Sequence, residues 1–151
     1  MKPERMTDRT SAAAVLKRTT YGVLSLSRDD TPYGIPMNHC YDEGKDVLYF
    51  HGAFEGKKAA LIQANPKASY VAVENPVIVP ERLTTHYDTA LATGEIYPVT
   101  DENEKAYALQ ALCRALCPGN EKAASMPFHT AARSVAIWKM TLTGLEGKRN
   151  R

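Results

Sequence analysis

The sequence lacks a long apolar run, a marked charge of one sign and a rich set of cysteines. Its uncharged apolar stretches fall far short of the roughly 20 residues of a membrane-spanning helix, and residues 1–5 begin no signal-peptide core, so we expect a cytoplasmic protein without a membrane segment. Lys and Arg total 19 against 17 Asp and Glu, and a net charge of +2 offers no basic field for nucleic acid. Three cysteines make no disulfide framework. We expect them as packing residues, with Cys113 and Cys117 in a buried seam on one helix face.

Several local motifs are also missing. No CxxC, HxH or HExxH spacing brings together the potential metal ligands, so we expect no metal site. The absence of GxSxG, GxGxxG and Walker patterns disfavours a serine hydrolase and the common nucleotide-binding folds. The metal ligands considered are His39, Cys40, His51, His86 and His129.

The length of the chain and its content of 44% hydrophobic and 24% charged residues are typical of one globular domain, so we expect a single domain spanning residues 1–151. Period-two patterns between turn signals predict six strands at 21–27, 33–41, 47–51, 68–74, 85–97 and 134–142. Helices are predicted at 12–18, capped by Thr10 or Ser11, at 57–64, and from Asp101 to Leu116. Loops are expected at 75–82 and 120–130, and loose tails at 1–10 and 145–151. This order indicates a mainly β chain with inserted helices, forming a six-stranded antiparallel barrel, closed or split.

The segment from Tyr49 to Lys58 is the most informative for chemistry. An apolar strand ends in His51 and Gly52, and a helix with Lys57 and Lys58 in its first turn follows Gly56. Glycine lets backbone amides approach a ligand, a helix start favours an anion, and lysine ammonium groups neutralise phosphate. Two alternatives remain open from the residues alone: solvated lysines, and a His51 ring that only bonds a backbone carbonyl.

In the residues and the order of several segments, the sequence resembles the pyridoxamine 5'-phosphate oxidase-like FMN-binding split barrels, and within them the 5-nitroimidazole resistance (Nim-type) proteins. The resemblance spans residues 13–149. It rests on residues 21–26, 32–38, 48–53, 56–57, 65–70, 87, 94, 104–105 and 147–148.

This resemblance implies FMN bound at the interface of a homodimer, with the flavin ring against the second and third strands. It also implies a role for seven residues of this chain. These are Pro36, Met37 and Asn38 beside the ring, His51 and Gly52 near its reactive edge, and Lys57 with Lys58 at the phosphate.

One departure from the family pattern bears on the reaction. Pyridoxamine phosphate oxidases have an Arg-Lys pair and an Arg-Gln-rich strand before Val-Glu-Gly, whereas this chain has Gly56-Lys57 and the stretch 89–94. The resemblance to Nim-type proteins implies instead the FMN-dependent reduction of a small planar acceptor such as a nitroimidazole, with His51 hydrogen-bonding or protonating it. Two alternatives stay open: a non-catalytic flavin- or haem-binding sensor, with His39 or His51 as axial ligand, and a deazaflavin-dependent reductase.

Overall fold

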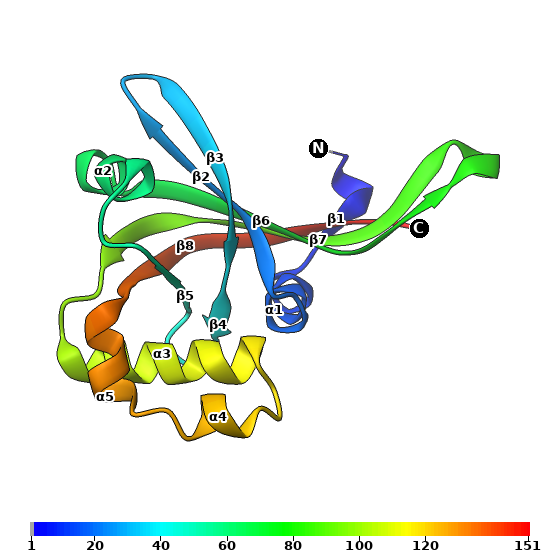
Figure 1. Cartoon of the computed structure of the whole chain (residues 1–151). Coiled ribbons are helices and arrows are strands. Elements are labelled where there is room, and N and C mark those ends of the chain that lie inside the picture. Colours follow the sequence, from blue (N-terminus) through cyan, green and yellow to red (C-terminus); the bar gives the residue numbers. More distant parts are fainter. Residues whose placement is uncertain (1) are drawn as a thin grey trace.

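The computed structural model describes residues 2–151 as one antiparallel sheet with helices around it (Figure 1). The strands are β1 (Met6–Thr7), β2 (Tyr21–Arg28), β3 (Thr31–Asn38), β4 (Cys40–Asp42), β5 (Val47–Gly52), β6 (Lys67–Val79), β7 (Thr84–Pro98) and β8 (Ala136–Asn150). The α-helices are α1 (Arg9–Arg18), α2 (Lys57–Ala64), α3 (Glu102–Leu116), α4 (Glu121–Ala124) and α5 (Phe128–Ala131). Short 3-10 helices are η1 (Pro3–Arg5), η2 (Pro80–Arg82) and η3 (Ala132–Ser134).

The strand order is β3-β2-β6-β7-β8-β5-β4, with β1 added on β8. The prediction of a mainly β, antiparallel chain with inserted helices is confirmed, but the described sheet has eight strands and is open. One extra strand arises because the predicted strand 33–41 is interrupted at His39. The His39 amide bonds the Thr20 carbonyl at 3.1 Å, outside the β3 ladder, and its side chain enters the core.

Both ends of the chain take part in the sheet, so the expectation of loose tails at 2–10 and 145–151 is wrong; Met1 lies outside the described residues. Thr7 pairs with Gly147, and β8 continues beside β7 as far as Asn150. Arg149 adds an ion pair to Asp88 at 2.5 Å. The polar composition of residues 145–150 did not indicate this pairing, because backbone hydrogen bonds to neighbouring strands can hold a segment that has few apolar side chains. The cap of α1 also differs, because Asp8 rather than Thr10 or Ser11 accepts the bond from the Ser11 amide.

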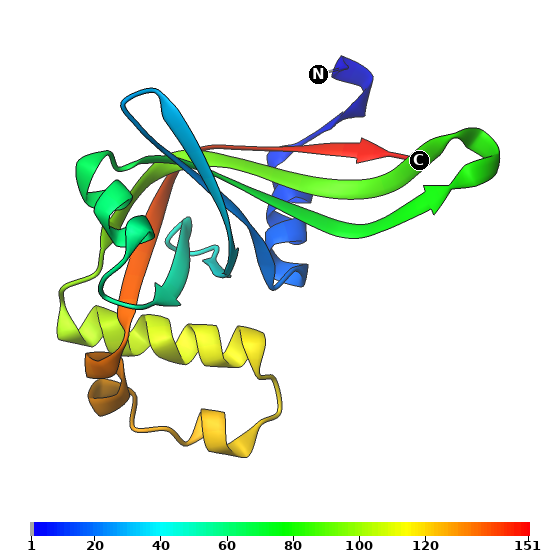
Figure 2. The same cartoon turned by 45° about the horizontal axis from the view of Figure 1, so that its top comes forward.

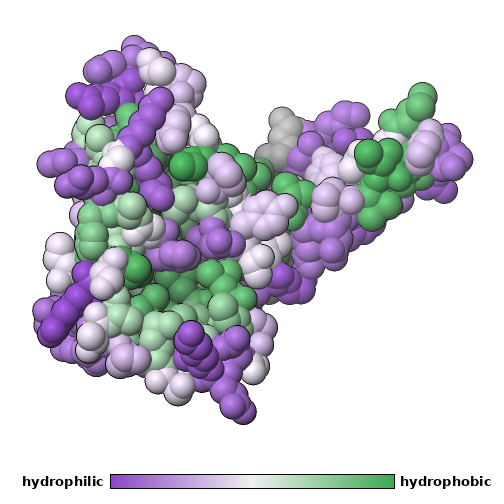
Figure 3. Space-filling view, in the orientation of Figure 1, coloured by the Kyte–Doolittle hydropathy of each residue, from purple (hydrophilic) through white to green (hydrophobic). Residues whose placement is uncertain are grey.

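The two predicted loops are largely ordered elements. Strand β6 continues through a register shift between Glu74 and Val77, and with β7 it forms an arm that projects from the rest of the molecule (Figures 1 and 2). The region 120–130 contains α4 and most of α5, and both short helices contact α3. At the arm's tip, Ile78 is 74% exposed and Leu83 95% exposed, so apolar side chains gather there (Figure 3).

Strand β5 lies between two apolar clusters, which fixes its position. Leu48 and Phe50 belong to the larger cluster with α1, α2 and β2, whereas Val47 and Tyr49 belong to the smaller one against α3. Successive side chains of a strand point to opposite faces, so β5 is covered on both sides until its last two residues. As for membrane segments, none of the helices in residues 2–151 combines the length and apolar character needed to cross a bilayer.

Candidate functional site

The end of β5 presents His51 and Gly52 on opposite faces. His51 is opposite Ile137 of β8 and is exposed, while Gly52 is opposite Ala136 and points toward the start of α2. The apolar run before them buries the strand and therefore holds its last residues in place. The strand thus delivers an imidazole to the surface beside a residue without a side chain.

Met37, Gly52, Lys58 and Trp138, here called the Lys58 cluster, come together from four separate elements. The Lys58 Nζ donates to Met37 Sδ at 3.3 Å and lies 4.7 Å from the centre of the Trp138 ring. A Cβ on residue 52 would stand 2.8 Å from Lys58 Nζ and 2.9 Å from Trp138 Cζ3. Glycine at position 52 therefore provides the room in which the Lys58 ammonium sits.

Lys58 is a partly buried cation whose neighbours are a sulfur atom and an aromatic ring. Among the described residues it forms no ion pair with a carboxylate, and burial lowers the pKa of its ammonium group. The pKa of His51 is lowered too, first by burial and then by the nearby Lys58 charge. An anion arriving at this position would relieve both effects, because a negative charge stabilises the charged forms.

Lys57 lies at the first turn of α2 and points elsewhere. Its Nζ is 4.6 Å from the centre of the Tyr33 ring on β3, while its own side chain remains exposed. Gly56 precedes the helix with a φ of 132°, a conformation that favours glycine, and no side chain caps the helix. The first amides of α2 are therefore available to an anion, with two lysines beside them.

The three predicted residues of β3 do not share one face. Met37 points inward to the Lys58 cluster, whereas Pro36 and Asn38 are exposed on the other face. The Asn38 side chain donates to the Thr20 carbonyl at 3.1 Å. The structure therefore brings Met37, Gly52 and Lys58 into contact and His51 within range of the Lys58 charge, while Pro36 and Asn38 lie apart from them.

His39 is the one fully buried polar residue described, and it is not available as a ligand of haem. Its Nδ1 lies 2.6 Å from the Tyr70 hydroxyl and its Nε2 lies 2.9 Å from the Leu16 carbonyl. Burial lowers the pKa of His39, and its Nε2 donates to the Leu16 carbonyl, which can only accept. The alternative in which His39 binds haem is therefore wrong for this conformation. Across residues 2–151, no three His, Cys, Asp or Glu side chains group as metal ligands.

Two residues of the site were not identified from the sequence. Trp138 forms the wall behind Lys58, and Tyr70 lies behind Met37, whose carbonyl accepts a bond from the Tyr70 hydroxyl at 2.9 Å. Trp138 is the sole tryptophan of the chain, which is a signal that could have drawn attention to it. Tyr70 carried no such signal, because it reads as an ordinary core residue of β6.

Solved structures of similar fold come from several bacteria. A candidate 5-nitroimidazole antibiotic resistance protein from Bacteroides thetaiotaomicron is 22% identical with a TM-score of 0.78, covering 95% of this chain and 87% of that one. The flavocytochrome Anf3 from Azotobacter vinelandii is 14% identical with a TM-score of 0.81, covering 100% and 72%. An FAD-binding protein from Mycobacterium smegmatis is 20% identical with a TM-score of 0.66, covering 97% and 98%. These likenesses show that the fold is of the split-barrel type.

The family comparison covers almost the whole chain. A search of curated proteins finds no match. Residues 8–149 match the pyridoxamine 5'-phosphate oxidase family, and this range contains every residue of the candidate site. The chain therefore belongs to the pyridoxamine 5'-phosphate oxidase family.

Proposed function

We propose that this protein is an FMN-dependent reductase of small planar acceptors such as nitroimidazoles, with the flavin held at a homodimer interface. The proposal rests mainly on the Lys58 ammonium group. This group is partly buried, forms no ion pair with a carboxylate among the described residues, and lies beside the first turn of α2, which no side chain caps. A cation in that setting needs an anionic partner, and a phosphate is the ligand that helix amides and lysines bind together. The neighbours named as FAD-binding proteins and as a candidate nitroimidazole resistance protein support a flavin and this acceptor.

The residues present fit FMN in two parts. Lys57 and the free amides of α2 would hold the phosphate, since both are exposed at the helix start. Lys58, placed by Met37 and Trp138 next to Gly52, would add its charge to the phosphate site from the more buried side. We propose Pro36 and Asn38 as neighbours of the ring on the family resemblance alone, since both lie on the face of β3 opposite Met37. FMN, when bound, supplies a centre that accepts and returns two electrons.

His51 would act on the acceptor. Its side chain stands at the exposed end of β5, and the partial burial of its ring, followed by the Lys58 charge, lowers its pKa and favours the neutral form at pH 7. A neutral imidazole can hydrogen-bond a nitro group, and its protonated form, more populated at lower pH, can give the acceptor a proton. Lys58 tunes this role because its charge adds to the effect of burial on the His51 ring.

The expected homodimer is supported by apolar side chains that the chain's own fold leaves uncovered. Ile78 and Leu83 at the tip of the β6–β7 arm are exposed, and so is Tyr21 on β2. Exposed apolar groups of this kind mark surfaces that associate with a partner. We expect sedimentation velocity of the purified protein to give a dimer at micromolar concentration, and a single monomeric species there would contradict this part of the proposal.

The Lys57→Ala variant is expected to bind FMN at least tenfold more weakly than the native protein. A charge-assisted bond to phosphate contributes about 1.5–3 kcal/mol, and 1.4 kcal/mol corresponds to a factor of ten. Riboflavin, which lacks the phosphate, should lose far less affinity. Quenching of flavin fluorescence on titration measures both ligands. Lys67→Ala changes another exposed lysine and serves as the control. Equal losses for FMN and riboflavin would contradict the assignment of Lys57 to the phosphate.

The absorption spectrum of the purified protein tests the cofactor itself. Flavin bands are expected, and titration with FMN, FAD and a deazaflavin should show FMN binding most tightly. The rival function is a haem-binding sensor, favoured by the likeness to a flavocytochrome and to an FAD- and haem-binding protein from Mycobacterium smegmatis. A Soret band that disappears in His51→Ala would support that rival, because His39 has no free ring nitrogen. A colourless protein that binds none of the three flavins would end the reductase proposal.

A further inference from the structure

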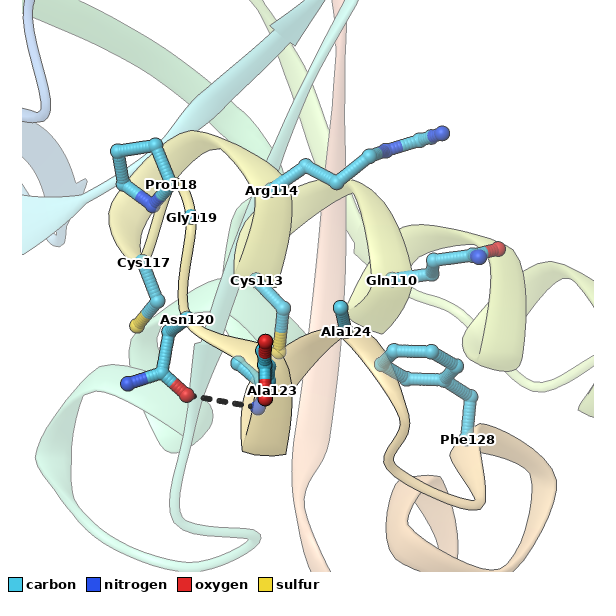
Figure 4. A pocket seen from close by; sticks show the side chains of 11 residues that line it. Gln110, Cys113, Arg114, Cys117, Pro118, Gly119, Asn120, Ala123, Ala124 and Phe128 are labelled. Carbon is cyan, nitrogen blue, oxygen red and sulfur yellow. Dashed lines mark hydrogen bonds between the residues drawn. The ribbon is translucent and has the colours of Figure 1, made fainter.

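A cavity of about 480 Å³ lies between the end of α3 and the short helices α4 and α5 (Figure 4). Its walls are mostly apolar, with Ala123, Ala124 and Phe128 facing Cys113 and Cys117. The volume falls within the usual range of small-molecule sites and far exceeds what one metal ion would fill. The cavity takes no part in the candidate flavin site, which is built from β3, β5, α2 and β8.

Two thiols line this cavity, Cys113 from the last turn of α3 and Cys117 from the residue that ends the helix. The Cys117 amide donates to the Cys113 carbonyl at 2.8 Å, and Cys117 then leaves the helical conformation with φ −127° and ψ 53°. The two thiols are near each other, since both line the cavity and Cys117 is one cause of the raised pKa of Cys113. In Figure 4 the Cys113 sulfur points toward α4, whereas the exposed Cys117 sulfur points to the side, so the Cys117 side chain must rotate about its Cα–Cβ bond to reach a shared atom.

The accessibility of the two thiols corrects the sequence prediction. Both were expected in a buried seam, but Cys117 is exposed and Cys113 only partly buried, because the cavity opens where packing was expected. Both are free, and the pKa of Cys113 is raised, first by burial and then by Cys117. Cys40, in contrast, is buried in the core as predicted and provides an internal reference thiol.

We propose that this cavity binds apolar ligands with a soft, thiol-bonding centre, of the class of trivalent organoarsenicals, and that Cys113 and Cys117 chelate the arsenic atom. An arsenoxide, R–As=O, reacts with the two thiols to form two As–S bonds. The two thiol protons leave with the oxygen as one water molecule, so arsenic stays trivalent and no oxidant or reductant is needed. The organic group R occupies the apolar space beside Ala124 and Phe128.

The test is the binding of phenylarsine oxide to the full chain, followed by intact-protein mass spectrometry. We expect one phenylarsenic group per chain that survives excess glutathione, a monothiol, and is removed by a dithiol such as dithiothreitol. Cys113→Ser and Cys117→Ser should each weaken retention at least 100-fold, because the second bond of a chelate forms at high effective concentration. Cys40→Ser should retain the adduct. Loss of the adduct to glutathione in the native protein would overturn the proposal.

The role of the apolar wall is tested separately with two arsenicals. Phenylarsine oxide should bind more tightly than arsenite, which has no organic group, and Phe128→Ala should reduce that preference about tenfold. Ala124 offers a second variant, since Ala124→Gln would fill the cavity and weaken the phenyl compound alone. Equal binding of the two arsenicals, unchanged in both variants, would overturn the assignment of the cavity. Circular dichroism confirms that each variant is folded, and FMN affinity should remain unchanged throughout.

Discussion

Replacing His51 with Gln is expected to slow the reduction of a nitroimidazole about 100-fold while leaving FMN affinity nearly unchanged. A side chain that transfers or shares a proton with the reacting group contributes on the order of 10²–10⁴ to a rate, and Gln can hydrogen-bond but cannot transfer a proton. The measurement is anaerobic stopped-flow reoxidation of the reduced flavin by the nitroimidazole, in a single turnover. No electron donor needs to be known for this experiment.

The pH dependence of the same reaction separates a proton-transfer role from a structural one. Burial, and then the Lys58 charge, lower the pKa of His51 below its ordinary value of about 6.5. The imidazolium fraction at pH 7 is therefore smaller than that of a free imidazole, and it grows as the pH falls into the acid range. The native rate should rise over that range, whereas the rate of His51→Gln should stay flat. A rise of equal size in the variant would remove His51 from the proton transfer.

Lys58→Met provides the matched control for this profile. Removing the ammonium group removes one cause of the lowered pKa of His51, so the inflection should move to higher pH. The ring resonances of His51 in an NMR titration should show the same upward shift in the cofactor-free protein. Rates are compared at saturating FMN, because Lys58 also belongs to the proposed cofactor site. An unmoved inflection would show that the two side chains do not interact.

The segment of β5 and α2 could be read from the sequence because its signals are local. An apolar strand, a glycine-bounded loop and an alanine-rich helix each depend on neighbouring residues, and they occur where predicted, with Lys57 beginning α2. The different positions of the Lys57 and Lys58 side chains could not be predicted in this way. It depends on Met37 and Trp138, which are distant in sequence and reach Lys58 only in the folded sheet.

The errors in the fold have the same physical origin. Residues 145–150 were expected to form a loose tail because they are mostly polar. They form a strand because they pair with β7, as Lys148 does with Thr89, and such a pairing between residues far apart in sequence leaves no local signal. Cys117 was expected to be buried because the spacing predicted which side chains share a helix face, but spacing does not predict whether other elements cover that face. Local patterns therefore predict whether a segment is a helix or a strand, but not which distant segment it pairs with or packs against.

The Gly94→Ala variant is expected to lose about 3 kcal/mol of unfolding free energy, although the added methyl group is the smallest possible change. A Cβ at position 94 would stand 2.0 Å from the Thr141 carbonyl oxygen and 2.9 Å from its carbonyl carbon. These are backbone atoms of β8, at the register shift beside Thr93, so no side-chain rotation relieves the contact. The strands must separate instead, and overpacking of this kind is costly.

Gly34→Ala is the matched control, because its Cβ would meet only Val23 Cγ1, at 3.4 Å, on the exposed edge strand β3. We expect it to change the stability by less than about 1 kcal/mol, while Gly94→Ala lowers the melting temperature by about 10 °C. Chemical denaturation followed by tryptophan fluorescence measures both variants. Because β8 carries Trp138 and pairs with His51, a strand shift at Gly94 should also weaken FMN binding. Equal stability of the two variants would mean that β7 and β8 can part at this point without loss.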